Sequence, residues 1–107
     1  MTYDTVLNAL GDETRRTVLM RLRTGERSVA EIADEMPVSR PAVSQHLRVL
    51  KAARLVTDRA EGARRLYSVD PRGLVALRSW LDGFWDKALV AFKQAAEREA
   101  VRGRRMR

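Results

Sequence analysis

The chain has no cysteine and a single histidine, His46, among its 107 residues. Disulfide bonds, thiolate zinc sites and cysteine nucleophiles are therefore excluded, and little is left for a histidine-based metal site. Long hydrophobic runs are also missing: the longest, residues 88–92, has five residues, whereas a membrane-spanning helix needs about 20. The chain also lacks paired carboxylates in an apolar setting, a nucleophile with its base and a phosphate-cradling glycine loop. We expect a soluble cytoplasmic protein that is not an enzyme and needs no cofactor.

Positive charge is unevenly distributed along the chain, whose net charge is +7. Residues 39–65 carry seven basic and two acidic side chains, and residues 98–107 carry five and one. Either block could meet a polyanion, meaning a nucleic acid or an acidic membrane surface.

Capping residues and helical spacing predict four helices in the first half of the chain. One ends before Gly11, and a second begins after Asp12. Ser28 with Glu31 forms a capping box for a third helix, which Pro37 ends. Ser39 caps a fourth helix that runs to about residue 53. The short turn between the third and fourth helices predicts a helix-turn-helix.

The second half of the chain predicts a β-hairpin and one more helix. Residues 55–59 and 64–69 are β-prone and are joined by residues 60–63, in which Gly62 supplies the turn. Asp70 and Pro71 then cap a last helix that reaches about residue 99, and residues 102–107 are expected to fray. We expect one domain over residues 1–100 and a basic C-terminal tail over residues 101–107.

The predicted helix at about 40–53 has an apolar face and an opposite polar face without an acidic residue. In the major groove, arginine can pair with guanine and glutamine with adenine. The first turn can hold a phosphate, and arginines around the 55–69 hairpin can lie on the DNA backbone or in the minor groove. The alternative is a solvated cationic surface. The candidate DNA-binding residues are Ser39, Arg40, Pro41, Ser44, Gln45, His46, Arg48, Arg59, Arg64 and Arg65.

The chain resembles the ArsR/SmtB family of winged-helix repressors over about residues 5–100. The resemblance rests on four stretches, residues 9–16, 28–33, 38–51 and 61–67. It implies a mainly α fold with a β-hairpin wing, a winged helix-turn-helix of order α-α-α-α-β-β-α. It also implies a prokaryotic homodimeric repressor that binds an imperfect inverted repeat in double-stranded DNA, usually near its own promoter. Arg54 departs from the pattern, because the family usually has glycine there, which suits a left-handed residue after a helix.

The last predicted helix carries an apolar arc of about 140°, wider than a coiled-coil seam. Part of this arc could cover the domain's own core, but its aromatic residues favour an interface between two copies. The resemblance implies that the first and last helices build that dimer. The candidate interface residues are Val6, Leu7, Leu10, Leu77, Leu81, Phe84, Trp85, Ala88 and Phe92.

Many members of the family sense metals through cysteine on the third helix, or through aspartate and histidine on the last. Here the last helix offers Asp82 and Asp86 without histidine, and exposed carboxylates at this spacing more often pair with a neighbour such as Arg78. We therefore expect no metal site, and the inducer stays unknown. A second hypothesis is a membrane-surface or protein-docking module that uses the last helix and the basic tail.

Overall fold

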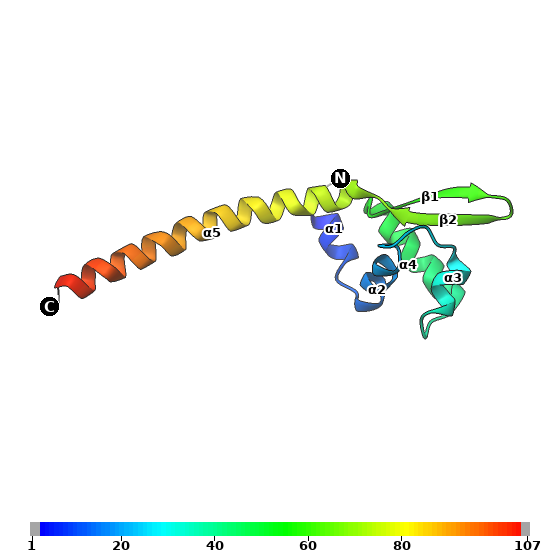
Figure 1. Ribbon diagram of the computed structural model, residues 1–107, viewed down its shortest axis with the longest axis horizontal. Helices are drawn as coiled ribbons and strands as arrows, with labels where there is room; N and C mark the ends of the chain where they lie inside the picture. Colours follow the sequence, from blue (N-terminus) through cyan, green and yellow to red (C-terminus); the bar gives the residue numbers. More distant parts are fainter. Residues whose placement is uncertain (1–2, 106–107) are drawn as a thin grey trace. The chain divides into compact units, whose positions relative to one another are not determined.

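The computed structural model describes residues 3–105, which form five helices and one antiparallel hairpin (Figure 1). The helices are α1 Tyr3–Ala9, α2 Glu13–Arg21, α3 Val29–Asp34, α4 Arg40–Ala52 and α5 Pro71–Arg105, and the strands are β1 Val56–Glu61 and β2 Arg64–Val69. This is the predicted element order. The chain divides between Leu77 and Arg78 into two compact units.

Side-chain caps start the short helices where the sequence predicts them. The backbone N–H of Ser28 donates to Oε1 of Glu31 at 3.1 Å, and the N–H of Glu31 donates to Oγ of Ser28 at 3.2 Å. Oγ of Ser39 accepts from the N–H of Ala42 at 3.3 Å at the start of α4. Because the first amides of a helix have no partner within it, these bonds fix both helix starts. α3 ends at Asp34, two residues before the predicted end, and Met36 lies in the turn.

The buried cluster at the centre of the first unit consists of aliphatic side chains, and Tyr67 packs against it partly buried. α4 contacts α1, α2 and α3 and also packs on β1. Its apolar residues Val43, Leu47 and Leu50 have no exposed surface. The buried cluster consists of Val6, Ala9, Val18, Leu22, Ile32, Val43, Leu47, Leu50, Ala53, Leu55 and Val56.

The turn after α4 is held by a left-handed arginine. Arg54 has φ 58°. Its N–H donates to the carbonyl of Lys51 at 3.0 Å, and the N–H of Leu55 donates to the carbonyl of Leu50 at 2.9 Å. These two bonds make a Schellman motif, which usually has glycine at the left-handed position. Arg54 therefore takes the conformation that the family's glycine suits.

The first turn of α5 lies against the end of α4. The N–H of Gly73 donates to the carbonyl of Arg54 at 2.8 Å. A Cβ at Gly73 would lie 2.7 Å from that oxygen and 2.9 Å from the carbonyl oxygen of Ala53. Only glycine therefore allows this close approach.

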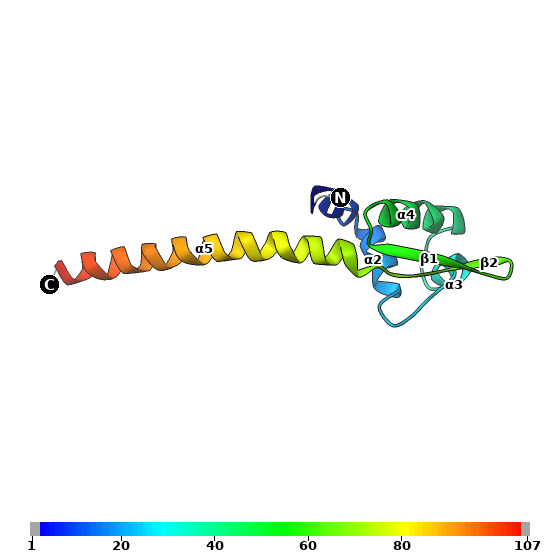
Figure 2. The same cartoon turned by 90° about the horizontal axis from the view of Figure 1, so that it is seen from above.

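The hairpin pairs Val56 with Val69 at its base and Glu61 with Arg64 at its tip. The loop therefore has two residues, Gly62 and Ala63, rather than the predicted four. Gly62 has φ 60°, and glycine first in a two-residue loop suits the twist of paired strands. Figures 1 and 2 both show the hairpin turn projecting beyond the helices.

One further pair of backbone bonds ties the hairpin to the helices. The N–H of Arg27 donates to the carbonyl of Tyr67 at 3.0 Å, and the N–H of Tyr67 donates to the carbonyl of Arg27 at 2.8 Å. Arg27 directly precedes the cap of α3, so β2 and the start of α3 are held together.

α5 continues to Arg105, so the predicted end near residue 99 is wrong. Residues 95–100 are rich in alanine, glutamate and arginine, which favour helix. Arg102 pairs with Glu99 one turn earlier, with 3.4 Å between Nη1 and Oε2. Cations in the last turn also suit the helix dipole. Of the predicted frayed end, residues 106 and 107 lie outside the described residues.

Candidate nucleic-acid interface

The exposed face of α4 carries the predicted reading residues. Six of the seven predicted contacts on α4 and its cap are exposed: Ser39, Arg40, Pro41, Ser44, Gln45 and Arg48. No acidic residue lies in α4. Thirteen residues make the helix about 20 Å long, a size that the major groove of B-DNA admits. The face therefore offers a row of hydrogen-bond donors to a polyanion.

His46 is only partly exposed, unlike its neighbours on α4. Its Nδ1 is buried and has no hydrogen-bond partner among the described residues. The hydrogen bond from the backbone of Arg15 lowers the pKa of Asp12, and His46 contributes a smaller electrostatic effect in the same direction. His46 thus lies between the core face and the reading face, and a DNA contact by this residue stays a prediction.

The three arginines predicted on the hairpin are paired with carboxylates in the DNA-free chain. Arg59 donates to both carboxylate oxygens of Glu26, with distances of 2.8 and 2.9 Å. In the other two pairs, the N–O distance is 3.4 Å between Arg64 and Glu31 and 2.7 Å between Arg65 and Asp58. Each arginine side chain remains more than half exposed. Phosphate groups could thus reach all three side chains, but only in competition with their carboxylate partners.

The structure brings two of these arginines close to the start of α4. Arg40, Arg64 and Arg65 line one hollow of about 480 Å³ together with the first turn of α3. Glu31 lies in the same hollow, and hydrogen bonds from the backbone and side chain of Ser28 lower its pKa. The start of α4 and the wing therefore share one hollow, which carries three arginines and one carboxylate.

Sequence reasoning missed the residue that organises the base of the hairpin, Asp58. Its side chain is only 8% exposed and lies 2.8 Å from Nζ of Lys51 and 2.7 Å from Nε of Arg65. Hydrogen bonds from Lys51 and then from Arg65 lower the pKa of Asp58. Asp58 thus links α4 to both strands, and only the strand register could have revealed it.

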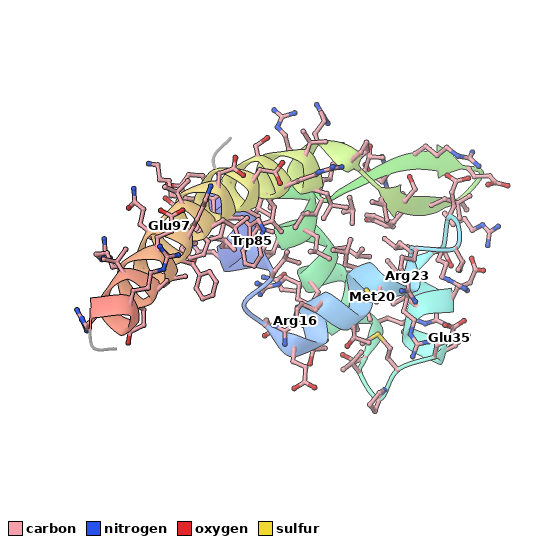
Figure 3. The ribbon with its side chains drawn as sticks, turned by 60° about the vertical axis from the view of Figure 1, so that its left-hand side comes forward. Arg16, Met20, Arg23, Glu35, Trp85 and Glu97 are labelled. Carbon is pink, nitrogen blue, oxygen red and sulfur yellow. The ribbon has the colours of Figure 1, made fainter. Side chains whose placement is uncertain are left out.

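Several predicted interface residues on α1 and α5 are exposed apolar side chains. Leu7 is 38% exposed, and on α5 the exposed fractions are 47% for Leu81, 59% for Phe84, 60% for Trp85 and 74% for Phe92. Trp85 stands out from its helix, as does Glu97 further along (Figure 3). Leu10, Leu77 and Ala88 are partly exposed.

Val6 does not fit the predicted interface. It has no exposed surface and packs inside the core of its own unit. The prediction of Val6 as a partner contact is wrong, because α1 turns this residue into the core of its own unit, where α1 packs on α4.

Within residues 3–105, no three His, Asp or Glu side chains gather in a way that could hold a metal ion. In the same part of the chain, no helix is both long and apolar enough to cross a bilayer.

A capped polar helix after a short turn, followed by a two-stranded wing with arginines, defines a winged helix-turn-helix DNA-binding protein. The family model "Bacterial regulatory protein, arsR family" matches residues 12–58. The HTH-type transcriptional regulator Rv2034 of Mycobacterium tuberculosis is 54% identical over 96 residues, which are 90% of each chain. The transcriptional repressor SdpR of Bacillus subtilis is 33% identical over 82 residues, 77% of this chain and 91% of SdpR.

Solved structures agree with this assignment. An ArsR-like transcriptional regulator from Rhodococcus sp. RHA1 superposes with a TM-score of 0.73 at 34% identity, covering 88% of this chain and 92% of the other. The homodimeric winged helix-turn-helix DNA-binding domain Mb0332 of Mycobacterium bovis gives 0.61 at 31% identity, covering 80% of both chains. The chain belongs to the ArsR family of transcriptional regulators. The predicted fold class and regulatory function are confirmed, and the relatives are regulators rather than enzymes.

Proposed function

We propose that the chain is a homodimeric repressor that binds an imperfect inverted repeat, acting on its own promoter among others, in a prokaryotic cytoplasm. The observation that carries this proposal is the exposed, acid-free face of α4 beside an arginine-bearing hairpin. Residues 1–100 serve as the DNA-binding and dimerisation domain, and residues 101–107 as a basic tail.

α4 reads the major groove of each half-site. Gln45 and Arg48 have the donor geometry for adenine and guanine edges, respectively, and Ser44 lies on the same face. Ser39, Arg40 and the first-turn amides hold a backbone phosphate next to them.

The hairpin positions the protein on the DNA backbone or in the minor groove. Arg59, Arg64 and Arg65 exchange their carboxylate partners for phosphates when DNA binds. Because exposed ion pairs contribute only about 0–1 kcal/mol each, this exchange costs little for Arg59 and Arg64. Arg65 leaves a carboxylate that is only 8% exposed, but Asp58 keeps its bond to Lys51. Phosphate contacts of this kind fix register without reading sequence.

Two copies associate through α1 and α5. Apolar aromatic residues on α5 that are more than half exposed in one chain support this association, since large exposed apolar patches mark interfaces. The similar domain from Mycobacterium bovis is a homodimer, and SdpR is a repressor. A dimer presents two reading helices, as an inverted repeat requires.

Genome-wide footprinting of the purified protein, with and without zinc, tests the function. We expect protection at a few inverted repeats that does not depend on zinc, because the chain has no cysteine and one histidine. Protection spread evenly over the genome would contradict sequence-specific repression, and release by zinc would contradict a response that does not involve metal.

Gln45→Ala and Arg48→Ala test the reading face on the operator found in this way. Each should weaken operator binding by about 1–3 kcal/mol and relax specificity at one base pair. Arg23→Ala is a matched control, because this exposed arginine lies in the turn after α2. Operator binding by both α4 variants at the wild-type level would place the reading surface elsewhere.

A further inference from the structure

A basic cleft lies at the junction of α4, β1 and α5, at the opposite end of α4 from its capped start. It measures about 500 Å³. Its lining combines four cations with a single acidic residue: Arg48, Lys51, Ala52, Arg54, Val56, Thr57, Asp70 and Arg72. The cleft lies wholly within the first unit.

Two of the four cations already have a carboxylate partner. Nζ of Lys51 lies 2.8 Å from Oδ1 of Asp58. Nη2 of Arg72 lies 2.7 Å from Oδ2 of Asp70, whose side chain is 6% exposed. Asp70 also accepts the backbone N–H of Arg72, so its oxygens are occupied. Arg48 and Arg54, in contrast, form no salt bridge among residues 3–105, although Arg54 lies near enough to Asp70 to help lower its pKa, after the larger effects of Arg72.

The backbone of Arg54 is strained. A left-handed conformation is unfavourable for a residue with a side chain, and Arg54 adopts it with φ 58°. Glycine would meet the geometric need without that cost. Strain that persists in a fold points towards function, and the feature that arginine adds at this position is a guanidinium beside Asp70.

We propose that this cleft binds a phosphate group, with Arg48 and Arg54 as its principal ligands. Arginine guanidinium groups match phosphate oxygens in pairs, and the exposed Thr57 adds a hydroxyl donor. The position of Arg54 is fixed in advance, since its N–H and carbonyl are both bonded, to Lys51 and Gly73. The phosphate can belong to the backbone of bound DNA or to a free phosphorylated anion.

Arg48 connects the two possible sources of the phosphate, bound DNA and a free anion, because it lies on the exposed DNA-reading face of α4 and also lines the cleft. A free anion that engages Arg48 withdraws it from DNA. By linkage, the anion and the operator then weaken each other's binding by the same factor. A backbone phosphate would instead add one contact to the DNA footprint.

Titration of the DNA-free protein with inorganic pyrophosphate, followed by calorimetry at constant ionic strength, tests the site. Arg54→Gly is the variant of choice because it keeps the turn. We expect pyrophosphate to bind wild type at least fivefold more tightly than Arg54→Gly, with Arg23→Ala like wild type. This arm contains no DNA, so its result is independent of the proposed repressor function.

The second arm measures the salt dependence of binding to a duplex of random sequence. Loss of about 0.9 from the log–log slope in Arg54→Gly would assign the site to a DNA phosphate. An unchanged slope together with weaker pyrophosphate binding would assign it to a free anion. If Arg54→Gly matches wild type in both arms, the proposal is overturned.

Discussion

At the scale of single residues, Arg54 shows how a local conformation can override a residue's preference. The sequence marks it as a departure from the family's glycine, and the structure gives it the left-handed backbone of that glycine. Leu50 and Leu55, which are both fully buried, flank the turn and hold it closed. Packing on both sides therefore imposes the strained conformation.

Arg54→Gly should stabilise the chain by about 1 kcal/mol, since it removes most of the left-handed strain. Arg54→Ala is the matched control, because it removes the same charge and keeps the strain. Urea unfolding of the three proteins separates these effects. Equal stabilisation by glycine and alanine would show that charge, rather than backbone strain, is the cause.

Asp58 makes stability depend on pH. Hydrogen bonds from Lys51 and Arg65 lower its pKa in the folded chain, whereas in the unfolded chain the pKa lies near about 3.9. The stability from Asp58 is therefore complete above that value and is lost as the pH falls through the lower, folded pKa.

Asp58→Asn should cost about 1–3 kcal/mol at pH 7, the range for hydrogen bonds to charged groups. The difference from wild type should shrink as the pH drops below about 4. Asp82→Asn is the control, because Asp82 lies on α5 with its side chain 70% exposed. Thermal unfolding from pH 7 to pH 3 measures this difference in stability between variant and wild type. A difference that stays constant over this range would show that the ionised carboxylate of Asp58 does not cause it.

At the scale of secondary-structure elements, the sequence predicted what local signals encode. Ser28 with Glu31 and Ser39 marked their helix starts, and Val43, Leu47 and Leu50 marked the buried side of α4. Contacts distant in the sequence were not predictable. Arg59 with Glu26 and Arg27 with Tyr67 join segments about 30 or more residues apart, as their residue numbers show, and they depend on the strand register. The last turns of α5 are hard to predict because a cluster of arginines occurs both in frayed ends and in helices.

The junction between α4 and α5 depends on Gly73. Gly73→Ala should destabilise the first unit by about 1–3 kcal/mol, the usual cost of overpacking, because its Cβ would press on two carbonyl oxygens. Gly103→Ala is the control, since nothing lies within 4 Å of a Cβ there. Differential scanning calorimetry compares the two. A Gly73→Ala protein as stable as wild type would mean that α5 can move away from α4.

At the scale of the whole molecule, the sequence predicted a DNA-binding part and a helix that associates with a second copy. In the structure, the DNA-binding part lies in the first unit and most of this helix lies in the second. The boundary between Leu77 and Arg78 was not predictable, since α5 runs through it without a break. Val6 was misplaced for a related reason. Helical spacing shows that a residue lies on the apolar face of its helix. It does not show whether this face packs on the core of the same chain or on a second copy.

Phe92→Glu should convert the proposed dimer into monomer at micromolar concentration, because a charge would be buried in an apolar interface. Val90→Glu is the matched control and should still dimerise. Val90 is also exposed, at 57% against 74% for Phe92, but it lies outside the apolar arc. Sedimentation velocity over a dilution series distinguishes the two, and a Phe92→Glu protein that still dimerises would remove this part of α5 from the interface.

The aliphatic core has a practical consequence for spectroscopy. Both tryptophans, Trp80 and Trp85, lie in the second unit, while the core cluster of the first unit has no aromatic member. Intrinsic tryptophan emission therefore reports the surroundings of α5, without a contribution from tryptophan in the first unit. Its wavelength should shift towards the blue when two copies associate, so the chain carries its own unlabelled reporter of assembly.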